Sequence, residues 1–111
     1  MFTSLTYEER LALVGLIKWL TLSDLETTPG ELALIDKVVK ELGEGEYHRL
    51  FNEVDSRFKG FEEFSAFVTA TGSTAARRLI YDFMLEYAEA DALDVNEGRD
   101  LAWLARIWSL D

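Results

Sequence analysis

The sequence predicts a single all-α domain, and three observations support this prediction. Apolar residues recur every three or four positions through most of the chain, as they do on the buried face of a helix. Typical helix-start residues precede these apolar series, and no stretch alternates apolar and polar residues over the length of a strand. Because 111 residues suffice for one sizeable core, we expect residues 1–111 to form one bundle of about six helices.

The first two expected helices have clear start signals. Thr6 and Glu9 have the spacing of a capping box, in which each side chain accepts a hydrogen bond from the backbone N–H of the other residue. The segment that follows, to about Leu22, is apolar on nearly every side and is therefore expected at the centre of the core. The second helix begins within residues 28–31, which supply an N-cap, a proline and a glutamate, and it ends at Gly43.

Two shorter helices are expected in the middle of the chain. The third has one apolar face, which comprises Tyr47, Leu50, Phe51 and Val54. The fourth begins near Gly60, and its apolar face comprises Phe61, Phe64, Phe67 and Val68. Phenylalanine recurs every three residues from Phe58 to Phe67, and core packing explains this spacing.

The last two helices complete the bundle. Ser73 is the expected cap of the fifth helix, in which adjacent apolar pairs recur every four residues: Leu79, Ile80, Phe83, Met84, Tyr87 and Ala88. Asp94 and Glu97 have capping-box spacing at the start of the sixth helix. Its apolar face comprises Leu101, Leu104, Ile107 and Trp108. Trp103 lies off this face, so we expect it to be exposed and able to anchor a partner.

The two ends of the chain resemble one another. Each has a long apolar helix, an acidic loop, a capped helix start and an amphipathic helix, and the acidic loops are residues 23–26 and 89–91. We therefore expect two pseudo-symmetric helix-loop-helix units whose two long helices pack together.

This organisation resembles the TerB-like domain family, which is named for tellurite-resistance proteins. The family's repeated loop reads roughly Ala-Asp-Gly, then variable residues, a cap residue, Pro or Asn, and Glu. The first loop matches at Asp24, Thr28, Pro29 and Glu31, and the second at Ala90, Asp91, Asp94, Asn96 and Glu97. The chain departs from the pattern at Leu25 and Ala92, which replace the glycine that would permit a positive φ.

The resemblance covers most of the chain, from about Leu11 to Leu110. It implies an all-helical, non-enzymatic module of bacterial stress-response or membrane-associated systems. It also implies an acidic surface that binds metal ions or protein partners.

The composition excludes several classes of partner. The net charge of −10 argues against binding to nucleic acids or anionic membranes, both of which require Lys and Arg. The longest apolar run, Leu11 to Leu20, is too short to span a bilayer and is interrupted by Lys18, so no direct membrane insertion is expected. The chain has no cysteine and no signal-peptide pattern at its start, which favours a cytoplasmic location.

No motif for catalysis or for a cofactor is present, so the chain is not expected to be an enzyme. His48 is the only histidine, and we expect it at the surface. No nucleophile elbow, phosphate loop or dinucleotide fingerprint occurs. An EF-hand is also excluded, because Ile35 and Ala105 stand where its bidentate glutamate would be.

The strongest candidate site is a stripe of carboxylates. Asp82, Glu86 and Glu89 lie at i, i+4 and i+7 on the fifth helix, and Asp91 follows at its end. Like charges at this spacing destabilise a helix by roughly 0.2–0.5 kcal/mol per pair, and acids at a helix C-terminus oppose the helix dipole. The stripe is either a solvated face or the binding surface for a basic protein partner. The leading hypothesis is a non-enzymatic interaction module that recruits such a partner through these four acids.

Two other functions are kept as alternatives. The protein could bind a divalent cation if the two acidic loops converge, with oxygen ligands from Asp24, Glu26, Asp91 and Asp94. It could also be a small acidic inhibitor or immunity-type protein that blocks a basic target. The sequence leaves open whether the chain forms a homodimer.

Overall fold

The computed structural model describes residues 2–24, 29–89 and 95–110. Within these residues the chain forms one short 3₁₀ helix and six α-helices, and it contains no strand. The elements are η1 Phe2–Ser4, α1 Tyr7–Asp24, α2 Pro29–Leu42, α3 Glu44–Arg57, α4 Phe61–Ala70, α5 Thr74–Glu89 and α6 Val95–Ile107. The prediction of an all-α fold with about six helices is therefore confirmed.

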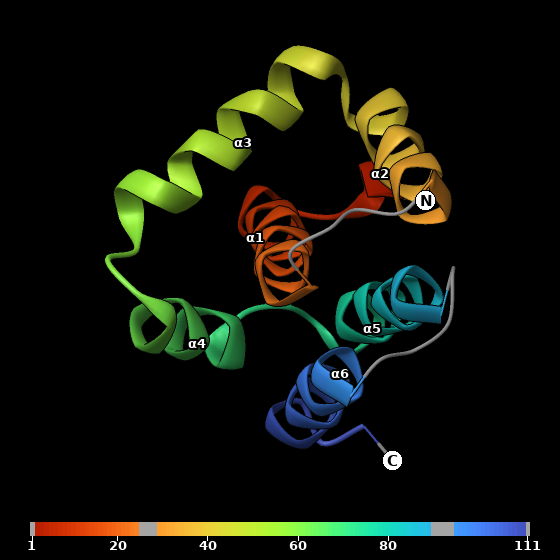
Figure 1. Cartoon of the computed structure of the whole chain (residues 1–111). Helices are drawn as coiled ribbons and strands as arrows, with labels where there is room; N and C mark the ends of the chain where they lie inside the picture. The colour runs from red at the N-terminus through yellow and green to blue at the C-terminus, as the bar shows by residue number, and fades with distance from the viewer. Residues whose placement is uncertain (1, 25–28, 90–94, 111) are drawn as a thin grey trace.

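Helix α1 lies at the centre of the molecule, with the other helices around it (Figure 1). Its residues 11–17 are all buried, as their apolar character predicted. The expected capping box forms at its start. The Thr6 N–H donates to Glu9 Oε1 at 2.8 Å, and the Glu9 N–H donates to Thr6 Oγ1 at 3.2 Å.

Helix α3 is longer than the sequence predicted. It spans 14 residues, as many as α2, whereas only α4, with 10 residues, is short. The polar ends of α3 carry no apolar signal, so its apolar face marks only its middle. Gly43 has a φ of 96° and lets α3 begin directly after α2. Its N–H donates to Val39 O at 2.8 Å, and its own carbonyl accepts from the Tyr47 N–H at 2.9 Å.

The two long helices, α1 and α5, pack against each other, which confirms that part of the prediction. Helix α1 also contacts α6, and α5 also contacts α2. The first helix-loop-helix unit is α1 and α2, and the second is α5 and α6. Each long helix thus contacts the amphipathic helix of the other unit, as a pseudo-twofold arrangement requires. The same central helix contacts α3 and α4 on its other sides (Figure 1).

The turn between α4 and α5 is fixed by hydrogen bonds. Ser73 caps α5, because its Oγ accepts from the Ala76 N–H at 3.1 Å, as predicted. The Trp108 indole N–H donates to Val68 O at 2.8 Å and so joins the end of α6 to α4.

In the part of the chain that is described, no helix combines the length and apolar character needed to cross a membrane.

Candidate functional site

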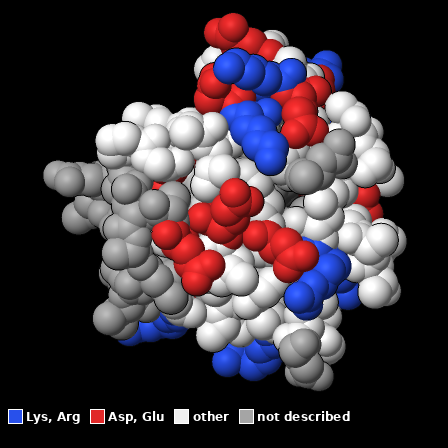
Figure 2. Space-filling view, turned by 90° about the vertical axis from the view of Figure 1, so that its right-hand side faces the viewer, with Lys and Arg blue, Asp and Glu red and all other residues white. Residues whose placement is uncertain are grey.

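Helix α5 separates its apolar and acidic side chains onto opposite faces. The buried face comprises Ile80, Phe83, Met84, Tyr87 and Ala88. Asp82, Glu86 and Glu89 lie on the other face and are exposed. A group of acidic side chains lies at the centre of this side of the molecule, with Lys or Arg side chains next to it (Figure 2). The predicted shared face of these three acids is therefore present.

The three acids surround a shallow hollow in the surface of α5. Asp82, Leu85, Glu86 and Glu89 line this hollow, which has a volume of about 380 Å³. Leu85 is half-buried and supplies an apolar patch among the carboxylates. We call these four residues the acidic face. An acidic rim around an apolar patch can accept a Lys or Arg head group together with the apolar part of its side chain.

The carboxylates of the acidic face differ in their partners. Asp82 is paired with Arg78 one turn earlier, with 3.3 Å between Oδ1 and Nε. Both of these side chains are more than half exposed. No Lys or Arg of the described residues forms an ion pair with Glu86 or Glu89. The two glutamates are therefore available to an external cationic group.

The other acids proposed from the sequence lie outside the described part of the chain. This holds for Glu26, Asp91 and Asp94, and for the side chain of Asp24. Whether the two loops converge therefore stays a prediction. Among the described residues, no group of three or more His, Cys, Asp or Glu side chains could hold a metal ion.

His48 is exposed, as predicted, and its Nε2 lies 4.0 Å from the Glu44 carboxylate.

The prediction that Trp103 is exposed is wrong in part, because this side chain is half-buried. Its ring lies 5.1 Å from that of Phe61, measured between ring centroids. Phe61 is 42% exposed, which corrects the assignment of every phenylalanine in the series to the core. Phe64 is fully buried.

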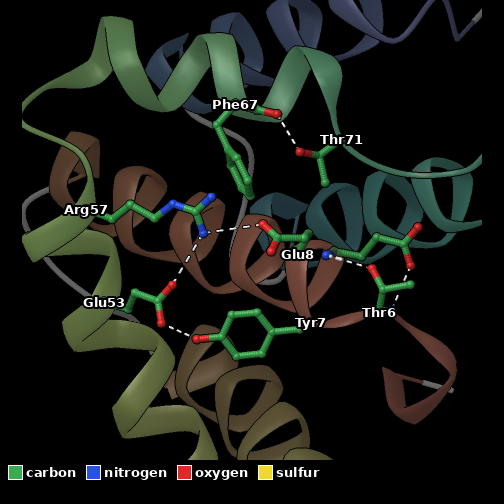
Figure 3. Close-up of polar contacts among 8 residues, drawn as sticks. Thr6, Tyr7, Glu8, Glu53, Arg57, Phe67 and Thr71 are labelled. Atoms are coloured by element: carbon green, nitrogen blue, oxygen red, sulfur yellow. Dashed lines mark hydrogen bonds and ion pairs between the residues drawn. The ribbon is translucent and has the colours of Figure 1, made fainter.

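A polar cluster between α1 and α3 was not predicted. The Tyr7 hydroxyl donates a hydrogen bond to Glu53, and Arg57 bridges Glu53 and Glu8 (Figure 3). The Arg57 Nη1 atom lies 3.3 Å from Glu8 Oε2 and 3.4 Å from Glu53 Oε2. The hydrogen bond to Glu53 raises the pKa of Tyr7, and burial raises it further. This cluster joins α1 to α3.

Glu9 has a second role that the sequence did not reveal. Its Oε2 accepts a hydrogen bond from the Ser73 N–H at 3.0 Å, so one carboxylate joins the start of α1 to the start of α5. The side chain is buried, at 7% exposure. Burial raises the pKa of Glu9, but hydrogen bonds from Thr6 and Ser73 outweigh burial and lower it. The capping-box motif predicted the local bond, whereas no sequence signal marks a partner 64 residues away.

Comparison with known proteins gives no assignment. No family model matches the chain, and no curated protein or solved structure matches it.

Proposed function

We propose that this protein is a non-enzymatic interaction module that binds the basic surface of a protein partner through its acidic face. The observation that carries the proposal is the arrangement of Glu86 and Glu89. Both are exposed beside the Leu85 hollow, and neither is paired with a cation of the described residues. Asp91, the fourth acid of the hypothesis, lies outside the described residues.

The electrostatics of the whole molecule favour this function. A net charge of −10 attracts basic proteins from a distance and raises their rate of association. Each exposed ion pair contributes only about 0–1 kcal/mol, so several pairs and an apolar contact are needed for a stable complex. The acidic face offers three carboxylates and Leu85 within one stretch of α5. A partner helix with Lys or Arg side chains around a central apolar residue would complement it.

The resemblance to TerB-like domains agrees with this proposal. It adds a bacterial stress-response or membrane-associated system as the setting in which the partner would be found. A small inhibitor of a basic target would use the same face, so the test below applies to it as well.

The test is a titration with a basic peptide. The probe is a helical peptide with three lysines, spaced four and then three residues apart, and a leucine between them. Its binding is measured by fluorescence anisotropy at low and moderate salt. We expect binding to weaken as salt rises, because exposed charges are screened. The triple variant Asp82→Asn, Glu86→Gln, Glu89→Gln should lose most of the affinity and most of the salt dependence.

A second triple variant controls for net charge. It removes three exposed acids elsewhere: Asp36→Asn, Glu44→Gln and Glu62→Gln. Asp36 is a close match for Asp82, because it also forms an ion pair at i, i+4, with Lys40 at 2.9 Å. We expect this control to retain most of the binding. An equal loss in both triple variants would show a general charge effect and would contradict a defined docking face.

A further inference from the structure

A second cleft lies between the C-terminal parts of α1 and α3 and the segment that leads into α4. Its lining comprises Lys18, Trp19, Val54, Asp55, Phe58, Lys59 and Gly60, and its volume is about 210 Å³. This volume is below the usual range for drug-sized ligands, which is roughly 300–1,000 Å³. The cleft therefore suits a molecule with one small ring.

Lys18 places a positive charge inside this cleft. It interrupts the apolar sequence of α1, its side chain is only 13% exposed, and its ammonium nitrogen is shielded from solvent. The ammonium pairs with Asp55 and lies 4.5 Å from the centroid of the Phe51 ring. In the described part of the chain Asp55 is its one oxygen partner, although an ammonium has three N–H donors. A ligand carboxylate that took the place of Asp55 would keep this ammonium paired.

The partner of Lys18 lies on the solvent side of the pair. The Asp55 side chain is 67% exposed, so a ligand carboxylate can replace it at the ammonium without leaving the buried charge unpaired. Lys59 adds a second positive charge at the exposed rim of the cleft. Two lysines and one aspartate make this lining net positive, in contrast to the chain as a whole.

The walls of the cleft are apolar and partly aromatic. Trp19 and Phe58 are half-buried and are held by the Phe64 ring, whose centroid lies 6.3 Å from that of Trp19 and 5.4 Å from that of Phe58. Val54 is buried and also lines the cleft. A Cβ added at Gly60 would meet open space, so this part of the rim is unobstructed.

We propose that this cleft binds a small aromatic monocarboxylate, with its carboxylate on Lys18 and its ring between Trp19 and Phe58. An apolar cleft with a few well-placed polar groups is the usual form of a small-molecule site. The ligand carboxylate competes with Asp55 for the ammonium, and burial of the ring provides the favourable free energy. This site is separate from the acidic face and does not depend on the function proposed for it.

The test uses benzoate as the probe and benzyl alcohol as its neutral counterpart. Backbone and indole N–H chemical shifts are followed by NMR during each titration. We expect saturable shifts at Trp19 and Gly60 with benzoate, and affinity for benzyl alcohol about tenfold lower or weaker still, because it cannot form the charged hydrogen bond. Absence of saturable shifts, or equal affinity for both compounds, would overturn the proposal.

Three variants identify the group that binds the carboxylate. Lys18→Met keeps a long apolar side chain without the charge and should abolish the preference for benzoate. Lys37→Met, at an exposed position on α2, is the matched control and should leave the preference unchanged. Asp55→Asn removes the competing carboxylate and should raise benzoate affinity severalfold. If Lys18→Met does not fold, the Asp55→Asn variant tests the proposal by itself. Unchanged or lower benzoate affinity in that variant would contradict the proposal.

Discussion

Glu9 is a buried carboxylate whose two oxygens accept hydrogen bonds from the start of α1 and the start of α5. Glutamine in its place has a single acceptor oxygen, so its NH₂ group would face one of the two N–H donors. We expect Glu9→Gln to lower the free energy of unfolding by about 1–3 kcal/mol, measured by urea denaturation. Glu62→Gln is the control, because Glu62 is an exposed acid in the first turn of α4. A loss in Glu9→Gln no larger than in this control would contradict the role assigned to Glu9.

The contribution of Glu9 should depend on pH in a defined direction. Hydrogen bonding lowers its pKa in the folded protein below the ordinary value of 4.5, against the effect of burial. A carboxyl group with a lowered folded-state pKa stabilises the protein fully above its unfolded-state pKa, and this contribution is lost as the pH falls through the folded-state value. The difference in unfolding free energy between the wild type and Glu9→Gln should therefore be constant at neutral pH and shrink below pH 4.5. A difference that grows on acidification would contradict this assignment.

At the scale of helices, α1 and α4 approach each other closely at Gly15. A Cβ added there would lie 2.3 Å from Cε1 of Phe64, whose ring is fully buried and cannot move aside freely. We expect Gly15→Ala to destabilise the protein by about 1–3 kcal/mol through overpacking, despite the better helix propensity of alanine.

Gly45 in α3 provides the matched control for Gly15. A Cβ at this position would meet nothing within 4 Å. Gly45→Ala should therefore stabilise the protein, by up to about 1 kcal/mol, because only the backbone entropy of the unfolded chain changes. Thermal unfolding of the two variants measures whether each substitution stabilises or destabilises the protein. If both substitutions change the stability in the same direction, the contact with Phe64 is not the cause.

The sequence predicts the helices well because their start signals are local. The capping hydrogen bonds of Thr6, Glu9 and Ser73 each join residues three positions apart, so their motifs are visible in the chain. The length of α3 was missed because its ends are polar and carry no periodic signal. Trp103 was misplaced because its contact with Phe61 joins two helices that are distant in sequence.

At the scale of the whole molecule, the sequence predicts those parts of the candidate sites that lie on one helix. Asp82, Glu86 and Glu89 share a face because helical geometry requires it. The cleft around Lys18 requires α1, α3 and the segment that leads into α4 to meet, and the second bond of Glu9 crosses the molecule. Such long-range contacts depend on tertiary packing, and a single sequence carries no local signal for them.

The net charge of −10 also predicts how ions affect stability. Salt should stabilise the folded state by screening repulsion among its many carboxylates. If the acidic face is a docking surface and the chain has no metal site, calcium, magnesium, manganese and zinc should not raise the melting temperature more than sodium chloride of equal ionic strength does. Thermal unfolding with each ion measures this directly.

A selective shift would instead favour the cation hypothesis for the two acidic loops. An ion at 100 times its dissociation constant stabilises the protein by about 2.7 kcal/mol, which corresponds to a shift of several degrees for a domain of this size. Asp24→Asn and Asp91→Asn should then remove the shift, whereas Glu86→Gln should leave it unchanged, because Glu86 is on the acidic face. Loss of the shift in Glu86→Gln as well would indicate that ions collect on the acidic surface in general. The same measurement thus separates a metal site formed by the loops from a docking face on α5.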